Sequence, residues 1–235
     1  MKSTDEQLKE RGFISDKELK KYFDCSDDQL FSYLNGKSSF ERTAAIKIIA
    51  KKSDIKFINL LCEKLFIENK LYTKIALCEC LTGYGFKAVP YLLPMLGKIG
   101  NNQHKAIALV DIGKKSFPLP RDIVARILIR IGPIVFEETK KIIATGDRNQ
   151  ILEAIDVVGH VTWKFQDYSC EDVLIELFEK TGEDILMQWK IIRAFQSFKS
   201  TKIINILEKV TQGTNEVIVS EAKRSLHRIN SRVFP

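Results

Sequence analysis

Apolar helical patterns come in pairs along this chain, and a short polar turn joins the two members of each pair. Almost every segment repeats apolar residues at the helical period of 3.6, and β-type alternation is sustained nowhere. In the second pattern of each pair a small or apolar residue marks the midpoint, and an apolar residue follows one helical turn later. These six midpoint residues are Ala45, Ala76, Ala125, Ala154, Ile191 and Ala222. The sequence therefore predicts an all-α fold of about six helical hairpins.

The spacing of the midpoint residues indicates a repeat array. Successive intervals are 31, 49, 29, 37 and 31 residues, and self-similarity at such periods is the signature of stacked repeats. The interval of 49 becomes 31 if residues 101–118 are an insertion. A small midpoint residue lets the partner helix approach closely. We therefore expect an α-solenoid over residues 25–235, interrupted by an insertion at 101–118.

Residues 1–24 are expected to form N-terminal capping helices. They carry six basic and six acidic residues around a thin apolar stripe, and a terminal repeat must shield one side of a stacked core. A targeting or partner-binding helix is the alternative. Helix starts are predicted by the capping-box patterns that begin at Ser15, Ser26 and Ser38, and by Pro133 after Gly132.

Four segments resemble HEAT repeats. Residues 40–49, 122–132 and 148–159 look like second helices of HEAT hairpins, and residues 87–96, with an internal proline, look like a first helix. The resemblance covers roughly residues 25–230 and points to bacterial and archaeal HEAT-repeat proteins. That grouping mixes scaffolds, chromophore lyases and DNA-binding enzymes, so the fold does not carry the function. The tetratricopeptide repeat is the nearest competitor, but its Trp/Gly/Tyr pattern is absent.

The positive charge is concentrated on the second helices. The chain has a formal net charge of +7; the expected second helices sum to +6 and the expected first helices to −2. Second helices line the concave surface of a HEAT solenoid, so the resemblance implies a mildly basic groove for an acidic partner or a phosphate backbone. Ordinary solvation of a helical face is the competing interpretation, and Glu153 and Asp156 interrupt the stripe. The candidate groove residues are Lys47, Lys51, Arg126, Arg130, Arg193, Arg224 and Arg228.

The insertion is the least repeat-like segment. Insertions in repeat proteins map to loops on one face, often the binding face, although a tolerated surface loop or a short packed helix would also fit. Its end, residues 117–120, contains two prolines and should be stiff and extended. The candidate partner-binding residues of this segment are His104, Lys105, Lys114, Lys115, Arg121 and Asp122.

Residues 161–169 form an aromatic-rich segment that we expect to lengthen the connector after the fourth hairpin. Trp163, Phe165 and Tyr168 could cover apolar surface between repeats. They could instead form a stacking platform for a base or for the apolar anchor of a partner.

Motifs for catalysis or metal binding do not stand out. The three histidines fall in different repeats without a second ligand at helical spacing, and we expect each at the surface or at a helix end. No phosphate loop or hydrolase motif occurs. Five scattered cysteines are typical of reduced, buried thiols in a cytoplasmic protein. The sequence predicts no membrane span, no secretory signal, no cofactor and no metal.

The leading hypothesis is a non-enzymatic scaffold that binds a protein partner, with an acidic surface, through the second helices and residues 101–122. The alternative is a nucleic-acid-binding protein, or an enzyme similar to the DNA glycosylases built on HEAT-like repeats, using the basic groove with Trp189 and Asp156. A chromophore or prosthetic-group lyase ranks below both, because only the repeat resemblance supports it.

Overall fold

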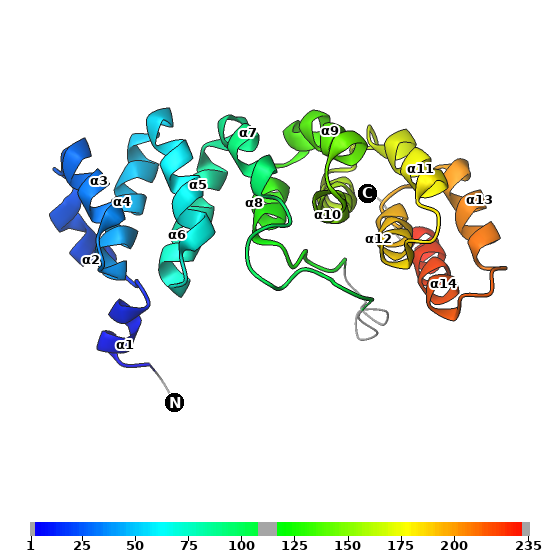
Figure 1. Ribbon diagram of the computed structural model, residues 1–235, viewed down its shortest axis with the longest axis horizontal. Helices are drawn as coiled ribbons and strands as arrows, with labels where there is room; N and C mark the ends of the chain where they lie inside the picture. Colours follow the sequence, from blue (N-terminus) through cyan, green and yellow to red (C-terminus); the bar gives the residue numbers. More distant parts are fainter. Residues whose placement is uncertain (1–2, 108–116, 232–235) are drawn as a thin grey trace. The chain divides into compact units, whose positions relative to one another are not determined.

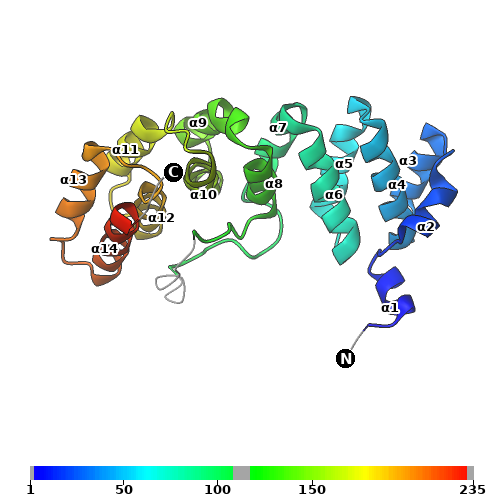
Figure 2. The same ribbon diagram turned by 180° about the vertical axis from the view of Figure 1, so that it is seen from behind.

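The computed structural model describes residues 3–107 and 117–231. Within this part of the chain every regular element is a helix, so the expectation of an all-α fold is confirmed. The chain divides into two compact units, Met1–Pro94 and Met95–Pro235. Figures 1 and 2 show the helices of both units from opposite sides.

The described part of the first unit, residues 3–94, contains seven α-helices. They are α1 (Asp5–Glu10), α2 (Asp16–Leu19), α3 (Asp27–Asn35), α4 (Ser39–Lys52), α5 (Ile58–Ile67), α6 (Leu71–Gly83) and α7 (Val89–Leu92). Helix α3 packs against α4, α5 packs against α6, and α4 and α6 lie side by side. The predicted hairpins at 27–52 and 55–82 are therefore present.

The described part of the second unit contains seven more α-helices. They are α8 (Ile123–Ile131), α9 (Phe136–Thr145), α10 (Arg148–Phe165), α11 (Glu171–Lys180), α12 (Ile185–Phe195), α13 (Thr201–Val210) and α14 (Glu216–Ser231). Each first helix packs against its second helix, in the pairs α9/α10, α11/α12 and α13/α14. The second helices also pack in series, α8 on α10, α10 on α12 and α12 on α14. This series places residues far apart in the sequence on adjoining helices.

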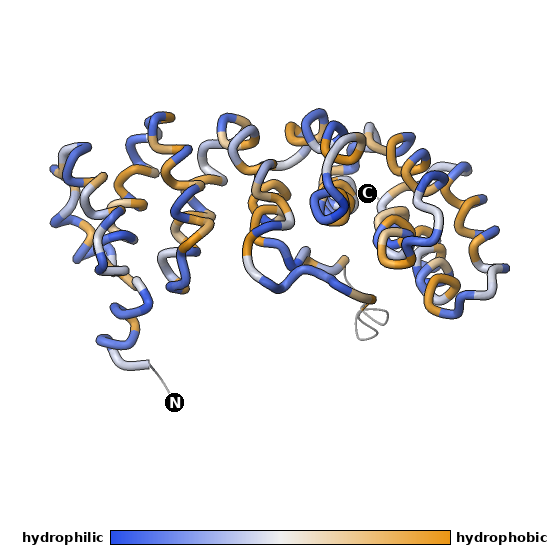
Figure 3. Tube along the Cα trace, viewed as in Figure 1, coloured by the Kyte–Doolittle hydropathy of each residue, from blue (hydrophilic) through white to orange (hydrophobic). Residues whose placement is uncertain are grey.

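The midpoint residues lie in the helical core, as expected. Ala45, Ala125, Ala154, Ile191 and Ala222 are fully buried, and Ala76 is 3% exposed. Apolar and polar residues alternate along the helices (Figure 3), so most of the helices bury one side against their neighbours, whereas α1 has no buried residue. Burial of apolar area at the midpoints stabilises the contact between consecutive second helices.

Several helix starts follow the sequence signals. Ser15 and Ser26 form complete capping boxes with Glu18 and Gln29, and Ser38 accepts a hydrogen bond from the Glu41 amide. Each cap satisfies amide groups that the first turn of a helix leaves without partners.

Two elements differ from the expectation. Residues 86–98 are not one helix, because Pro90 and Pro94 interrupt it; the segment consists of the 3₁₀ turn Gly85–Ala88, α7 and the 3₁₀ turn Leu93–Met95. Helix α10 continues to Phe165, so Trp163 and Phe165 are helical and do not belong to a connector. The stretch from residue 96 to α8 contains no α-helix among its described residues.

Candidate functional site

A fully buried lysine lies at the centre of the second unit. The Nζ atom of Lys190, on α12, donates to Glu153 Oε1 at 2.9 Å, to Asp156 Oδ2 at 3.0 Å and to the Leu152 carbonyl at 3.0 Å. The side chain of Lys190 is 0% exposed, and those of Glu153 and Asp156 are 2% and 7% exposed. These bonds join α10 to α12 in the interior.

The same network extends from α12 to α14. Arg193 Nη2 lies 3.3 Å from Asp156 Oδ1, and the Arg193 guanidinium lies 4.0 Å from the centre of the Trp189 ring. Trp189 Nε1 donates to Glu221 Oε2 at 3.1 Å, and Glu221 is also paired with Arg224 at 2.6 Å. We call these residues the buried network. Its members are Glu153, Asp156, Trp189, Lys190, Arg193, Glu221 and Arg224.

The two carboxyl groups on α10 differ in their electrostatics. Burial raises the pKa of Glu153 to about 7, against the opposing charge of Lys190. Among the described residues, the second carboxyl oxygen of Glu153 has no hydrogen-bond partner. Burial alone would also raise the pKa of Asp156, but the charges of Lys190 and Arg193 outweigh it and hold that pKa below its usual value. Asp156 is therefore an anion at neutral pH, whereas Glu153 exchanges its proton near pH 7.

The charged groups of the buried network are equal in number, and Glu153 is partly protonated near pH 7. Three cations, Lys190, Arg193 and Arg224, stand against three carboxyl groups. Desolvated pairs of this kind contribute little net stability, but removing one partner is costly because the other remains buried and charged. The arrangement fixes the register between α10, α12 and α14.

The described ends of the insertion pack against helices of the second unit. The His104 ring stands edge-on to Trp189 with centroids 5.4 Å apart, and Gln103 donates to Asp122 Oδ2 at 2.9 Å. Asp122 Oδ1 caps α8 by accepting from the Ala125 amide, and burial raises the pKa of Asp122. Asp122 thus has a structural role at the start of α8.

At the other end of the insertion, Phe117 packs on α10. Its ring lies 5.4 Å from His160 and 5.6 Å from Trp163, between centroids. A Cβ added at Gly159 would lie 3.0 Å from Phe117 Cζ and 2.9 Å from Ala194 Cβ, so only glycine permits this close approach. Burial lowers the pKa of His160 despite its hydrogen bond to the Pro118 carbonyl.

The candidate site residues separate into three groups. Arg193, His104 and Asp122 were expected on accessible surface, but they are 2%, 7% and 0% exposed, and this expectation is wrong. The predicted residues that are exposed or half-buried are Lys47, Lys51, Lys105, Arg121, Arg126, Arg130, Arg224 and Arg228. Lys114 and Lys115 lie outside the described residues.

The exposed candidates are divided between the two units. Lys47 and Lys51 lie on α4 in the first unit, and the Lys51 ammonium sits 4.1 Å from the centre of the Phe23 ring. Arg126 and Arg130 lie on α8 in the second unit, where Arg126 Nε donates to the Pro120 carbonyl at 2.7 Å. Each pair is spaced i, i+4, so its two members share one side of their helix.

Sequence reasoning named five members of the buried network but missed Lys190, Glu221 and the pairing between helices, although a signal was present. Glu153 precedes Lys190 by 37 residues, and Asp156 precedes Arg193 by 37 residues. This is also the interval between the midpoint residues Ala154 and Ile191. Opposite charges at equivalent positions of consecutive repeats therefore indicated a contact between adjacent second helices.

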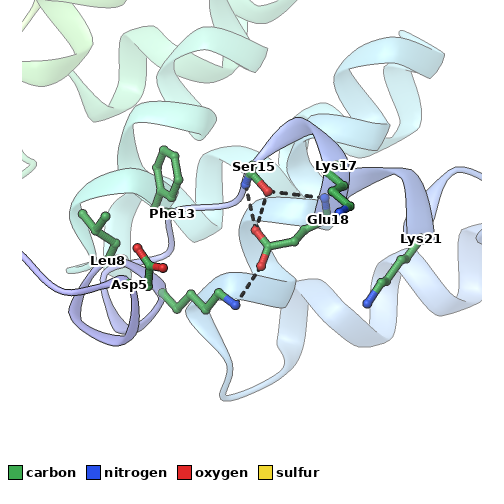
Figure 4. A pocket seen from close by; sticks show the side chains of 8 residues that line it. Asp5, Leu8, Phe13, Ser15, Lys17, Glu18 and Lys21 are labelled. Carbon is green, nitrogen blue, oxygen red and sulfur yellow. Dashed lines mark hydrogen bonds and ion pairs between the residues drawn. The ribbon is translucent and has the colours of Figure 1, made fainter.

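A hollow of about 430 Å³ lies beside the N-terminal helices. Figure 4 shows Asp5, Leu8 and Phe13 on one side of it and Lys17 and Lys21 on the other. Glu18, which also lines it, accepts from Ser15 and is 2.7 Å from Lys9 Nζ. Lys17 and Lys21 add positive charge to the rim of the hollow.

The cysteines and the potential metal-ligating side chains do not form a reactive site among the described residues. Burial raises the pKa of Cys62, Cys80 and Cys170 to about 12, so these thiols are protonated and poor nucleophiles at neutral pH. Within residues 3–107 and 117–231, no three His, Cys, Asp or Glu side chains converge in a way that could hold a metal ion. In the same part of the chain, the helices lack the length and apolar content that crossing a bilayer requires.

Comparison with known proteins adds no assignment: no protein-family model matches the chain, and no curated protein is significantly similar to it.

Proposed function

We propose that this chain is a non-enzymatic interaction module, a HEAT-like stack of helical hairpins that binds a protein partner carrying an acidic surface. The partner contacts the exposed basic side of the second helices. Two features support the proposal. The ionisable side chains of the buried network are paired with one another and shielded from solvent, whereas basic side chains on α4 and α8 face the solvent.

The observation that carries this proposal is the pair Lys47 and Lys51 on α4. Seven of the 14 residues of α4 are buried, on most sides of the helix, and these lysines occupy the side that remains. Among the described residues, neither lysine has a carboxylate within ion-pair distance. Arg126 and Arg130 repeat the pattern on α8, where the other side of the helix is buried. Surface cations that no carboxylate neutralises steer an acidic protein toward the face that carries them.

Affinity capture from native lysate tests this proposal. Wild-type protein is compared with the charge-reversed variant Lys47→Glu/Lys51→Glu, and the matched control is Lys180→Glu/Lys202→Glu, which reverses exposed lysines on the first helices α11 and α13. We expect a stoichiometric partner with wild type and control, and its loss from the α4 variant. Recovery of the same partners by all three proteins would contradict the proposal.

Nucleic-acid binding is the alternative, because the same cations could contact phosphates. Its enzymatic form needs access to Asp156 and Trp189, which are 6% and 0% exposed, and this burial favours the protein partner. Titration with a DNA duplex distinguishes the two. Contacts with phosphates predict an affinity that falls steeply between low and physiological salt, whereas an interaction module shows no saturable duplex binding.

A further inference from the structure

An exposed apolar surface in the first unit is formed by the N-terminal segment and the start of α6. Phe13, Leu71 and Ile75 are 40%, 45% and 42% exposed. The Tyr72 ring contacts Phe13 edge-on, with centroids 5.3 Å apart, and the Arg11 guanidinium lies 5.6 Å from its centre. We call these five residues the Phe13 surface. Tyrosine and arginine in such a setting are the residue types enriched at binding hot spots.

Backbone contacts hold the Phe13 surface in place. The Tyr72 amide donates to the Arg11 carbonyl at 3.0 Å, and Ser39 Oγ donates to the Glu10 carbonyl at 2.9 Å. Between Arg11 and Phe13, Gly12 has φ +88°, and a Cβ there would lie 2.3 Å from Thr73 Oγ1. Gly12 is thus buried against α6 while its two neighbours remain accessible. A surface fixed in this way loses little conformational entropy on binding.

Cations and acids both lie around the Phe13 surface, and the cations are in modest excess. Phe13 also lines the hollow of about 430 Å³, whose rim carries Lys17 and Lys21. Asp5 is an acid on that rim, and Glu18 is neutralised by Lys9 at 2.7 Å. Over residues 5–21 and 70–75, which contain the Phe13 surface and the hollow, seven basic residues stand against five acidic ones.

We propose that the Phe13 surface binds an amphipathic helix of net negative charge, presented by a partner protein. Leu71 and Ile75 lie one helical turn apart on α6, and such a ridge packs against apolar residues spaced i, i+4 on another helix. Carboxylates on the flanks of that helix meet Arg11, Lys17 and Lys21. The described elements of the first unit are helical, so an added β-strand finds no sheet edge there. This inference rests on the proposed function and specifies one of its binding surfaces.

The probe is a fluorescent designed peptide of about 18 residues, roughly five helical turns, with leucines at i, i+3, i+4 and i+7 and glutamates elsewhere. A second peptide keeps the leucines and replaces every glutamate by lysine. Fluorescence anisotropy with the full chain should show saturable binding of the acidic peptide and binding of the basic peptide weaker by at least about tenfold. Absence of saturable binding, or equal binding of both peptides, would overturn the proposal.

The variant Ile75→Glu places a like charge in the apolar contact and should reduce the affinity for the acidic peptide by at least about tenfold. The control is Ile185→Glu, because Ile185 on α12 is 46% exposed and lies in the other unit; it should bind as wild type does. Circular dichroism confirms that both variants fold. An equal loss in both variants would refute the assignment. If Ile75→Glu instead retains the partner that Lys47→Glu/Lys51→Glu loses from lysate, the proposed function stands and the Phe13 surface is wrong.

Discussion

Replacing Lys190 by methionine should strongly destabilise the second unit. The substitution removes an ammonium group that donates to Glu153, Asp156 and the Leu152 carbonyl. Methionine has a similar length and refills the space, so the loss is mainly electrostatic. Breaking a buried ion pair by removing one partner costs about 3–5 kcal/mol. That is a large fraction of the roughly 5–15 kcal/mol that stabilises a typical domain.

Urea unfolding followed by tryptophan fluorescence measures this loss, because both tryptophans, Trp163 and Trp189, lie in the second unit. The control Lys180→Met removes an exposed lysine, 75% accessible, and should change the unfolding free energy by less than about 0.5 kcal/mol. The destabilisation by Lys190→Met should shrink from pH 8 to pH 5, because protonation relieves carboxylates that have lost their cation. A cost below about 1 kcal/mol at pH 8 would refute the account of the buried network.

Three further predictions concern the same interior and the N-terminal segment. For Glu153, the pKa of about 7 in the folded state exceeds the usual 4.5, so its carboxyl stabilises the fold below pH 4.5 and this contribution is lost as the pH rises through 7. The unfolding free energy of Glu153→Gln minus that of wild type should therefore rise by up to about 3 kcal/mol from pH 4.5 to pH 7.5. Urea titrations at the two pH values measure this difference, and a fall in it would contradict the prediction. Gly159→Ala should cost about 1–3 kcal/mol by overpacking α10 against α12 and Phe117, measured as a lower denaturation midpoint; an unchanged midpoint would show that the two helices separate freely. Gly12→Ala should release residues 3–14 from α6, because it combines a left-handed φ with a clash at Thr73, and limited proteolysis should then cleave this segment faster than in wild type.

The helical hairpins could be predicted from the sequence because their cause is local. Periodicity located the second helices, and the buried alanines at positions 45, 125 and 154 mark where neighbouring helices approach. Capping patterns located the starts of α2 and α3. The effect of prolines inside an apolar pattern was harder to predict. Pro90 lies in the first turn of α7, and Pro94 lies in the 3₁₀ turn that follows, so α7 has only four residues.

The candidate site could be predicted only in part, because burial of a polar side chain depends on several elements at once. Lys190 and Arg193 read as solvent-facing when α12 is considered alone. They are buried because α10 supplies the carboxylates of Glu153 and Asp156 beside them, and because His104, distant in sequence, packs on Trp189. By contrast, the exposure of Lys51 and Arg130 follows from their own helices, and their positions were predicted correctly.

The most direct test of the central claim, that the exposed basic faces bind a protein, is quantitative mass spectrometry of material captured from native lysate with and without nuclease. Capture is carried out with wild type and with Lys47→Glu/Lys51→Glu. We predict that one acidic protein is recovered at near-stoichiometric yield, that nuclease leaves the yield unchanged, and that the charge reversal abolishes it. Loss of the captured protein on nuclease treatment would contradict the account and assign the basic faces to nucleic acid.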